Sequence, residues 1–224
     1  MNYTLLKPFY VLTIIVHFFM ATMFLSNNGF AQEFVQGIDV SNFQGTINWK
    51  QVKQAGFTFA FAKATEGISY TDIQFDSNWH GMRAEKIIRG AYHYFYADDD
   101  ATEQAKHFVA VVGLLRKGQD LPPMLDLEDK PKDKKQYIAS VTTWLNYVEQ
   151  ALGCKPIIYV DRPFADDHLG NKFNNYPLWI AEYTSASQPN LPDGWTLWSF
   201  WQYSDSGKVA GINGVVDMDK FNGS

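Results

Sequence analysis

The sequence predicts an α/β protein, a single TIM-like barrel whose C-terminal third has few helices. From Gln36 onward, short apolar runs alternate with amphipathic stretches, which is typical of βα units and a mainly parallel sheet. Eight such runs have the length of strands. After about Asp166 the connections are short and rich in Pro, Gly, Ser and Asn, without a long helical pattern. With 224 residues and 46% hydrophobic content, the chain can bury one large core, so we expect one domain.

The predicted strands are short, and polar residues follow most of them. They cover residues 37–40, 57–62, 87–94, 124–129, 156–160, 177–181, 198–202 and 215–218. Residues 57–62 are apolar at nearly every position, which predicts that both faces of this strand are buried. Residues 63–67 are polar and predict a loop.

Apolar spacing of three and four residues predicts the helices between these strands. They cover residues 49–55, 75–82, 101–115 and 137–152. Asp98, Asp99 and Asp100 precede the third helix, where acids stabilise the positive end of the helix dipole; a metal site is the alternative explanation. Gly153 is expected to end the fourth helix.

The N-terminus has the pattern of a secretory signal peptide. Lys7 precedes an apolar run from Phe9 to Leu25, and Gly29 and Ala31 supply small residues for cleavage after Ala31. We therefore expect a signal peptide at residues 1–31, a barrel domain at 32–224, and export to the periplasm or the exterior. A retained membrane anchor is the competing interpretation, because the run is almost long enough to span a bilayer.

Composition excludes several classes of function. The net charge is −5 and no Lys/Arg cluster marks a face, so we expect no nucleic-acid partner. Cys154 is alone, which excludes an intrachain disulfide and a Cys-based metal site. No G-x-S-x-G, H-E-x-x-H or Gly-rich phosphate motif occurs, and His80 and His107 are expected on helix surfaces. We expect a monomer without metal or cofactor.

The run MLDLED at 124–129 places two acids on one side of a strand. Side chains at i and i+2 share a face roughly 6–7 Å apart, so Asp126 and Glu128 should be neighbours. A buried pair of carboxyl groups cannot easily ionise together, which raises one pKa and suits a general acid. Taken alone, a D-x-E pattern is common and is more simply explained by two solvated acids at a strand end.

Polar residues recur where the predicted strands end, and in a parallel barrel these ends meet at one mouth. They are Asp39, Lys63, Glu66, His93, Tyr94, Asp126, Glu128, Tyr159, Glu182, Tyr183, Gln202, Tyr203 and Asp217. Because the first and eighth strands are neighbours in a closed barrel, Asp39 and Asp217 should meet. Lys63 ends a buried strand and needs an acid nearby, for which Asp39 is the candidate.

This arrangement indicates carboxylate chemistry on a neutral polymer. For an exported protein with 16% aromatic residues, the reaction class it favours is glycoside hydrolysis. Aromatic rings are the usual surfaces for sugars. Tyr94, Tyr159, Tyr183, Trp179 and Trp201 could line a sugar groove, although each is equally explained by core packing.

The residues also carry a resemblance to a known family, the glycoside hydrolase family 25 lysozymes, or Chalaropsis-type muramidases. The matching motifs lie between residues 37 and 223: GIDVS at 37–41, QG at 44–45, FAKATEG at 61–67, GAYHY at 90–94, LDLE at 125–128, WIAEY at 179–183, WQYS at 201–204 and GVVD at 214–217. The resemblance implies a (β/α)5β3 barrel. It also implies cleavage, without metal, of the β-1,4 bond between N-acetylmuramic acid and N-acetylglucosamine in the glycan strands of peptidoglycan.

The resemblance further implies roles for individual residues. Glu128 matches the general acid and base, Asp126 its partner carboxylate, and Asp39 and Asp217 the remaining acids of the site. Asp126 is expected to stabilise the positive charge at the sugar, directly or through the N-acetyl group of the substrate. Asp219 departs from the family pattern, in which Asn is common. For substrate binding we expect Lys63, Tyr94, Tyr159, Tyr183 and Gln202. A chitinase-like hydrolase and a non-catalytic wall-binding barrel are the alternatives.

Overall fold

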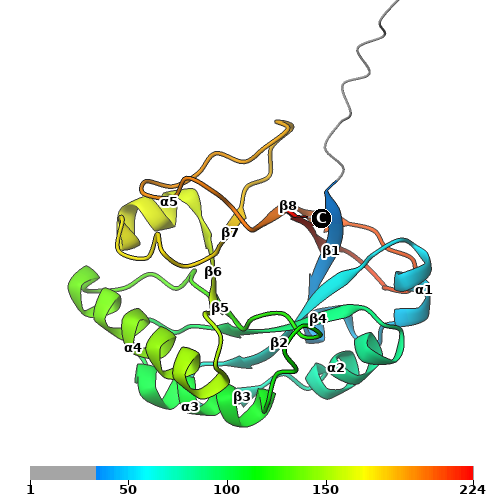
Figure 1. The fold of residues 1–224 in the computed structure, drawn as a ribbon, viewed down its shortest axis with the longest axis horizontal. Helices are drawn as coiled ribbons and strands as arrows, with labels where there is room; N and C mark the ends of the chain where they lie inside the picture. The colour runs from blue at the N-terminus through cyan, green and yellow to red at the C-terminus, as the bar shows by residue number, and fades with distance from the viewer. Residues whose placement is uncertain (1–33, 224) are drawn as a thin grey trace, which may run out of the picture. The chain divides into compact units, whose positions relative to one another are not determined.

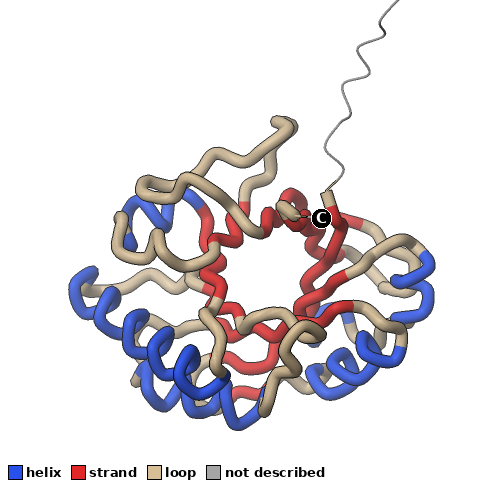
Figure 2. The backbone as a smooth tube through the Cα atoms, viewed as in Figure 1, coloured by secondary structure: helices blue, strands red, loops and turns tan. Residues whose placement is uncertain are grey.

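The strands close into a ring in the computed structural model, which describes residues 34–223. β1 (Val35–Val40) pairs with β2 (Phe59–Glu66) on one side and with β9 (Val216–Phe221) on the other. Around the ring the order is β1, β2, β4, β5, β6, β7, β8, β9. Figures 1 and 2 show the strands as a ring. The remaining strands are β3 (Tyr70–Thr71), β4 (Ile88–Tyr94), β5 (Met124–Asp126), β6 (Ile157–Asp161), β7 (Leu178–Ala181) and β8 (Phe200–Gly207). The predicted barrel is confirmed, while the predicted signal peptide at 1–31 lies outside the described residues.

One strand of the ring runs against the others. β1, β2, β4, β5, β6, β7 and β8 run parallel to one another, whereas β9 is antiparallel to both β8 and β1. In the β1–β9 register, Val35 lies opposite Phe221 at the base of the barrel and Asp39 lies opposite Asp217 at the mouth. The start of β9 therefore lies beside the ends of the parallel strands.

Helices surround the outside of the ring and become short toward the C-terminus (Figure 2). They are η1 (Asn42–Gln44), α1 (Trp49–Gln54), α2 (Phe75–Ala84), α3 (Ala101–Val112), α4 (Lys134–Leu152), α5 (Arg162–Phe164) and η2 (Ala165–Leu169). Residues 170–223 contain no helix, as the sequence predicts. None of the helices in the described part of the chain is both long enough and apolar enough to span a bilayer.

Local capping explains where the two long helices begin and end. The Asp100 carboxylate accepts hydrogen bonds from the backbone N–H groups of Thr102 and Glu103, at 2.8 and 2.9 Å, so the acids before α3 include its N-cap. α4 begins at Lys134, earlier than predicted, because Asp133 caps it. It ends as expected at Gly153, which adopts the left-handed conformation (φ 69°).

Two apolar cores lie on the two sides of the sheet, as the apolar run in β2 predicts. Phe59 and Phe61 point into the barrel, and Ala60 and Ala62 belong to the core between the strands and the helices. The inner core is largely aromatic and consists of Phe59, Phe61, Tyr92, Met124, Ile157, Tyr159, Trp179 and Phe200. The rings of Phe61 and Trp179 are 4.6 Å apart. This layer forms the floor on which the polar residues of the mouth lie.

Three of the predicted boundaries that differ from the structure lie at the mouth of the barrel. Residues 63–66 do not form a loop: β2 continues through them, with a register shift between Lys63 and Thr65. β5 ends at Asp126, so Glu128 lies in the following loop. Asp217 is at the start of a strand that continues to Phe221, and not at the end of one.

Gly90 provides a test of the inner packing. It lies opposite Phe61 in the β2–β4 register, and a Cβ atom at Gly90 would approach a ring carbon of Phe61 to 2.2 Å. Gly90→Ala is therefore expected to lower the free energy of unfolding by about 1–3 kcal/mol, measured by urea denaturation.

The matched control for this prediction is Phe61→Leu, made alone and in combination with Gly90→Ala. Since the smaller side chain leaves room for the added methyl group, the double variant should be more stable than the sum of the two single effects. Strictly additive effects would contradict this packing.

Candidate active site

The four predicted acids lie together at the mouth of the barrel, in a pocket of about 230 Å³. The residues that line it are Asp39, Val40, Ser41, Phe43, Gln44, Lys63, Tyr92, Tyr94, Met124, Asp126, Glu128, Tyr159, Gln202 and Asp217. The residues expected from the sequence to be catalytic or to bind substrate all line this pocket, except Tyr183. The pocket therefore collects side chains from β1, β2, β4, β5, β6, β8 and β9.

The strands position the acids in two groups. Asp39 and Asp217 are paired opposite each other across β1 and β9. Asp126 ends β5, next to Tyr94 of β4 and Tyr159 of β6, and Glu128 follows two residues later. The expected meeting of Asp39 and Asp217 is confirmed, although the reason is the antiparallel direction of β9.

Desolvation in the pocket is the main cause that raises the pKa values of all four acids, and neighbouring acids add to it. Desolvation is the main cause for Asp126, and the nearby Glu128 adds to it while Lys63 opposes it. Desolvation also raises the pKa of Glu128, and its neighbour Tyr159 lowers it by hydrogen bonding. The pKa of Asp39 is raised by burial and then by Asp217, while that of Asp217 rises to about 6, mainly through desolvation. The pocket therefore favours the protonated forms of its carboxyl groups.

Exposure distinguishes the two acids of the LDLE motif. Asp126 is buried, with 7% of its surface exposed, and its Oδ1 atom has no hydrogen-bond partner among residues 34–223. Glu128 is an exposed residue, although it lines the same pocket. Glu128 can therefore reach a bound molecule from the rim, while Asp126 meets it from below.

Gln202 connects the two sides of the mouth. Its Oε1 atom accepts hydrogen bonds from the hydroxyl groups of Tyr159, at 2.9 Å, and Tyr183, at 2.8 Å. Its Nε2 atom donates to Asp39 Oδ2 at 2.8 Å. Tyr183, which is half-exposed, thus contacts the site through Gln202.

The expected pairing of Lys63 with Asp39 was wrong. Lys63 forms its ion pair with Glu66, which also accepts a hydrogen bond from the hydroxyl group of Tyr96. The Lys63 ammonium also lies 4.9 Å from the ring centre of Tyr94. In a regular strand, residues 63 and 66 would face opposite sides. The register shift between Lys63 and Thr65 interrupts this alternation and brings Glu66 to the side of Lys63, which the predicted loop at 63–67 did not suggest.

His93 ends the third predicted strand but lies away from the pocket. Its Nδ1 atom is 2.7 Å from Thr65 Oγ1, and its Nε2 atom is 3.1 Å from Gln104 Oε1. Burial lowers the pKa of His93 to about 3, and its ring stacks on Trp144. It is a neutral core residue, while its neighbours Tyr92 and Tyr94 line the pocket.

The two tryptophans offered as groove residues are core residues. Trp179 belongs to the inner aromatic layer and Trp201 to the outer core, and each is almost completely buried. Phe43, which is 86% exposed, lines the pocket although the sequence did not single it out, and Gln44, noted only as part of the QG motif, lines it too. Gln44 completes a capping box with Ser41, a pattern readable from their spacing.

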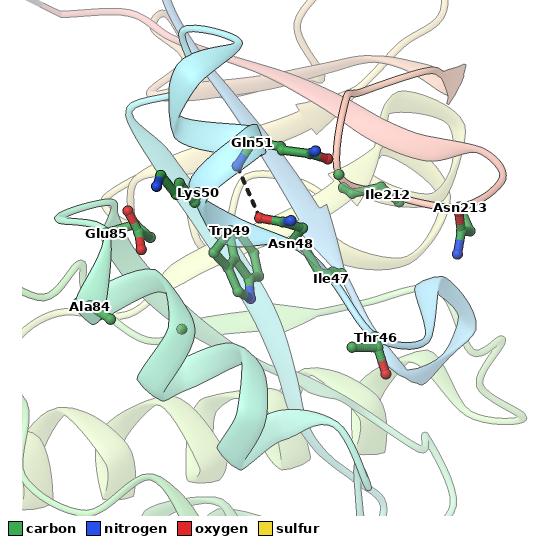
Figure 3. A pocket seen from close by; sticks show the side chains of 12 residues that line it. Thr46, Ile47, Asn48, Trp49, Lys50, Gln51, Ala84, Glu85, Ile212 and Asn213 are labelled. Atoms are coloured by element: carbon green, nitrogen blue, oxygen red, sulfur yellow. Dashed lines mark hydrogen bonds between the residues drawn. The ribbon is translucent and has the colours of Figure 1, made fainter.

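Two other hollows differ in their relation to the acids. One, of about 610 Å³, adjoins the mouth because Glu128 also lines it, together with Lys130, Asp161, Phe164 and His168 among others. A hollow of about 620 Å³ lies on the flank, between α1, α2 and the turn before β9, and contains none of the expected site residues (Figure 3). The mouth and its neighbour therefore form the candidate binding region.

The geometry suits acid–base chemistry. Coupled carboxyl groups with raised pKa values provide both a proton donor and a negative charge in one pocket. Within residues 34–223, no group of three or more His, Cys, Asp or Glu side chains is arranged to hold a metal ion.

Comparison with known proteins gives one consistent family. Residues 38–212 match the model of the glycosyl hydrolases family 25. Lysozyme M1 of Streptomyces globisporus is 39% identical over 85% of this chain and 68% of its own length, and the N,O-diacetylmuramidase of a Chalaropsis species is 31% identical over 82% and 96%. The crystal structure of a lysozyme from Streptomyces coelicolor superposes with a TM-score of 0.81 and 36% identity, covering 86% of this chain and 94% of that one.

Replacing Gln202 tests the hydrogen-bond network. Gln202→Leu leaves the buried Asp39 carboxyl without its amide donor and two tyrosine hydroxyl groups without their acceptor. We expect the free energy of unfolding to fall by about 2 kcal/mol or more, measured by urea denaturation. Gln188→Leu, in an exposed loop, is the control and should have little effect. Equal effects of the two substitutions would contradict a supporting role for Gln202.

Proposed function

The chain belongs to the glycosyl hydrolases family 25, and from this premise we propose that it hydrolyses the β-1,4 bond between N-acetylmuramic acid and N-acetylglucosamine in peptidoglycan. The relatives named lysozyme and N,O-diacetylmuramidase support this substrate. The observation that carries the proposal is the pocket itself, in which carboxyl groups from three distant strands and a loop meet with raised pKa values.

Glu128 is the proposed general acid and base. Glu128 and Asp126 repel each other, so a proton held near neutral pH belongs to the pair. Glu128 is the exposed member at the rim and can deliver that proton to the glycosidic oxygen. After the leaving sugar departs, the Glu128 carboxylate can accept a proton from the attacking water.

Asp126 is the proposed stabilising carboxylate, and its unpaired Oδ1 atom supports a specific version of this role. A buried acceptor without a partner is costly, and the N–H of a substrate N-acetyl group would satisfy it. Held there, the acetyl oxygen of the substrate can attack the anomeric carbon as the glycosidic bond breaks, which leads to retention of configuration.

The remaining residues are proposed to hold the sugar. Asp39 and Asp217 form the wall across from Glu128, and Gln202 keeps Asp39 in place. Lys63, Tyr94 and Tyr159 provide hydrogen-bond donors and ring faces in the same pocket. The hollow that shares Glu128 gives the polymer a path beyond the site of cleavage.

The N-terminal pattern supports a proposed location for this activity. We infer that residues 1–31 direct export and that the barrel at 32–224 acts outside the cytoplasm, where peptidoglycan lies. We further propose that the barrel acts as a monomer, since the pocket is formed within one chain. N-terminal sequencing and sedimentation of the exported protein test both points.

Products released from purified walls test the function and separate it from chitinase-like activity. We expect fragments that end in reducing N-acetylmuramic acid, identified by mass spectrometry, and no comparable release from chitin. Retention should appear by NMR as an initially β-configured product. Reducing N-acetylglucosamine ends, or faster cleavage of chitin, would exclude the proposed specificity.

Glu128→Gln tests the assignment of the acid. The amide has no proton to donate, so we expect kcat on peptidoglycan to fall by about 10²–10⁴-fold with an unchanged circular dichroism spectrum. Glu103→Gln, on the exposed surface of α3, is the control and should retain full activity. Undiminished wall lysis by the Glu128 variant would refute the assignment.

A further inference from the structure

Asp219 is a buried carboxyl group that the proposed reaction does not use. None of its surface is exposed, and neither of its oxygen atoms accepts a hydrogen bond from an N–H or hydroxyl donor within the described chain. Residues 34–223 also contain no ion pair that involves Asp219. An ionised carboxylate in such a position would be strongly unfavourable, because nothing replaces the water it has lost.

The neighbours of Asp219 come from three other strands and offer no positive charge. On β9 itself, Asp217 is two residues away, and on β1 the nearest acid is Asp39. Gln202 of β8 lies opposite Asp219, but its amide donates to Asp39 and forms no hydrogen bond with Asp219. From β7, the indole N–H of Trp179 is near and weakly favours the charged form.

The nearby cations are engaged elsewhere. Lys63, at the mouth, is paired with Glu66. Lys220 follows Asp219 on β9, but its ammonium lies 4.4 Å from the ring centres of both Trp201 and Tyr203, and Trp201 belongs to the outer core. Asp39, Asp217 and Asp219 are thus three acids without a counter-cation from the described residues.

A proton shared by two of these acids would reduce the electrostatic repulsion among them. Burial, followed by the charges of Asp39 and Asp217, raises the pKa of Asp219, and the neighbouring Asp39 side chain raises it further. The same neighbour relation lowers the pKa of Asp39, as expected if a protonated Asp219 donates a hydrogen bond and Asp39 accepts it. With a proton on Asp219, Asp39 would accept a second hydrogen bond besides the one it accepts from Gln202 Nε2.

We propose that Asp219 is a positioning residue that stays protonated in the folded protein and donates its proton in a hydrogen bond to Asp39. The pair carries at most one negative charge, and Asp39 is fixed against the wall that faces Glu128. Loss of the proton would add a second negative charge to the pair and push Asp39 away. The consequence for catalysis rests on the proposed muramidase activity, whereas the shared proton does not.

Asp219→Asn tests the proposal, because an amide can donate the same hydrogen bond but cannot lose a proton. A carboxyl group whose pKa is raised by folding stabilises the protein at low pH and loses that contribution as the pH rises from the unfolded value toward the folded value. The Tm of the wild type should therefore fall more steeply between pH 4 and 8 than that of the variant. A pKa difference of about one unit between the folded and unfolded states is large enough to be measured in this way. Asp193→Asn, which removes an exposed acid, should follow the wild type.

Activity and spectroscopy give two further measurements. At pH 5 the Asp219→Asn variant should keep kcat/KM within about twofold of the wild type, and the alkaline decline of its kcat/KM should move to higher pH. An infrared band of a protonated carboxyl group should be present in the wild type at pH 7 and weaker in the variant. The infrared and Tm measurements do not need a substrate, so they remain informative if the proposed activity is wrong.

Two results would overturn the proposal. Parallel loss of Tm with rising pH in the wild type and the variant, together with an unchanged infrared band, would show that Asp219 is ionised. A rise in the Tm of the wild type on adding Ca²⁺ or Mg²⁺, absent in the variant, would show that a cation and not a proton neutralises the acids. If Asp219→Asn does not fold, the infrared band of the wild type, assigned by its pH dependence, decides the question.

Discussion

Closure of the ring by β9 is the constraint on which the site depends. In a barrel of parallel strands, only the C-terminal ends of the strands lie at the mouth. β9 runs in the opposite direction, so its N-terminal end lies there. This places Asp217 opposite Asp39, and Asp219 one step deeper, against the aromatic layer. The acidic wall is thus held by backbone hydrogen bonds on both sides and not by oppositely charged side chains.

The electrostatic cost of placing Asp39, Asp217 and Asp219 close together explains much of the chemistry of the pocket. Like charges in a desolvated site raise each other's pKa values, and the fold tolerates this because backbone pairing and the aromatic floor supply stability elsewhere. Lys63 moderates the effect on Asp126 but is itself paired with Glu66. The site is therefore arranged to hold protons, which a glycosidase that works by acid catalysis requires.

The barrel and most of the site were predictable from the sequence because both follow short-range patterns. Apolar runs locate strands, and in a parallel barrel the residues at the end of a strand lie at the mouth, which correctly grouped Asp39 and Asp126, together with Glu128 in the loop that follows β5. Such patterns do not reveal strand direction or side-chain pairing. They therefore gave the right neighbour for Asp217, although the strand that carries it was assigned the wrong direction. They also paired Lys63 with Asp39, whereas its partner is Glu66. His93 was placed at the mouth, although the alternation of side chains along β4 turns it into the core. The significance of Asp219 also depends on contacts between distant strands, which spacing alone does not encode.

The pairing of β1 with β9 has a consequence for the connectivity of the fold. Val35 and Phe221 are opposite each other at the base, remote from the acids. A short linker between these positions would leave the hydrogen-bonded ring unchanged, and new chain ends could open in the exposed loop around Ser185–Gln188. The barrel is accordingly suited to circular permutation, because the order of its strands in space does not depend on where the polypeptide starts.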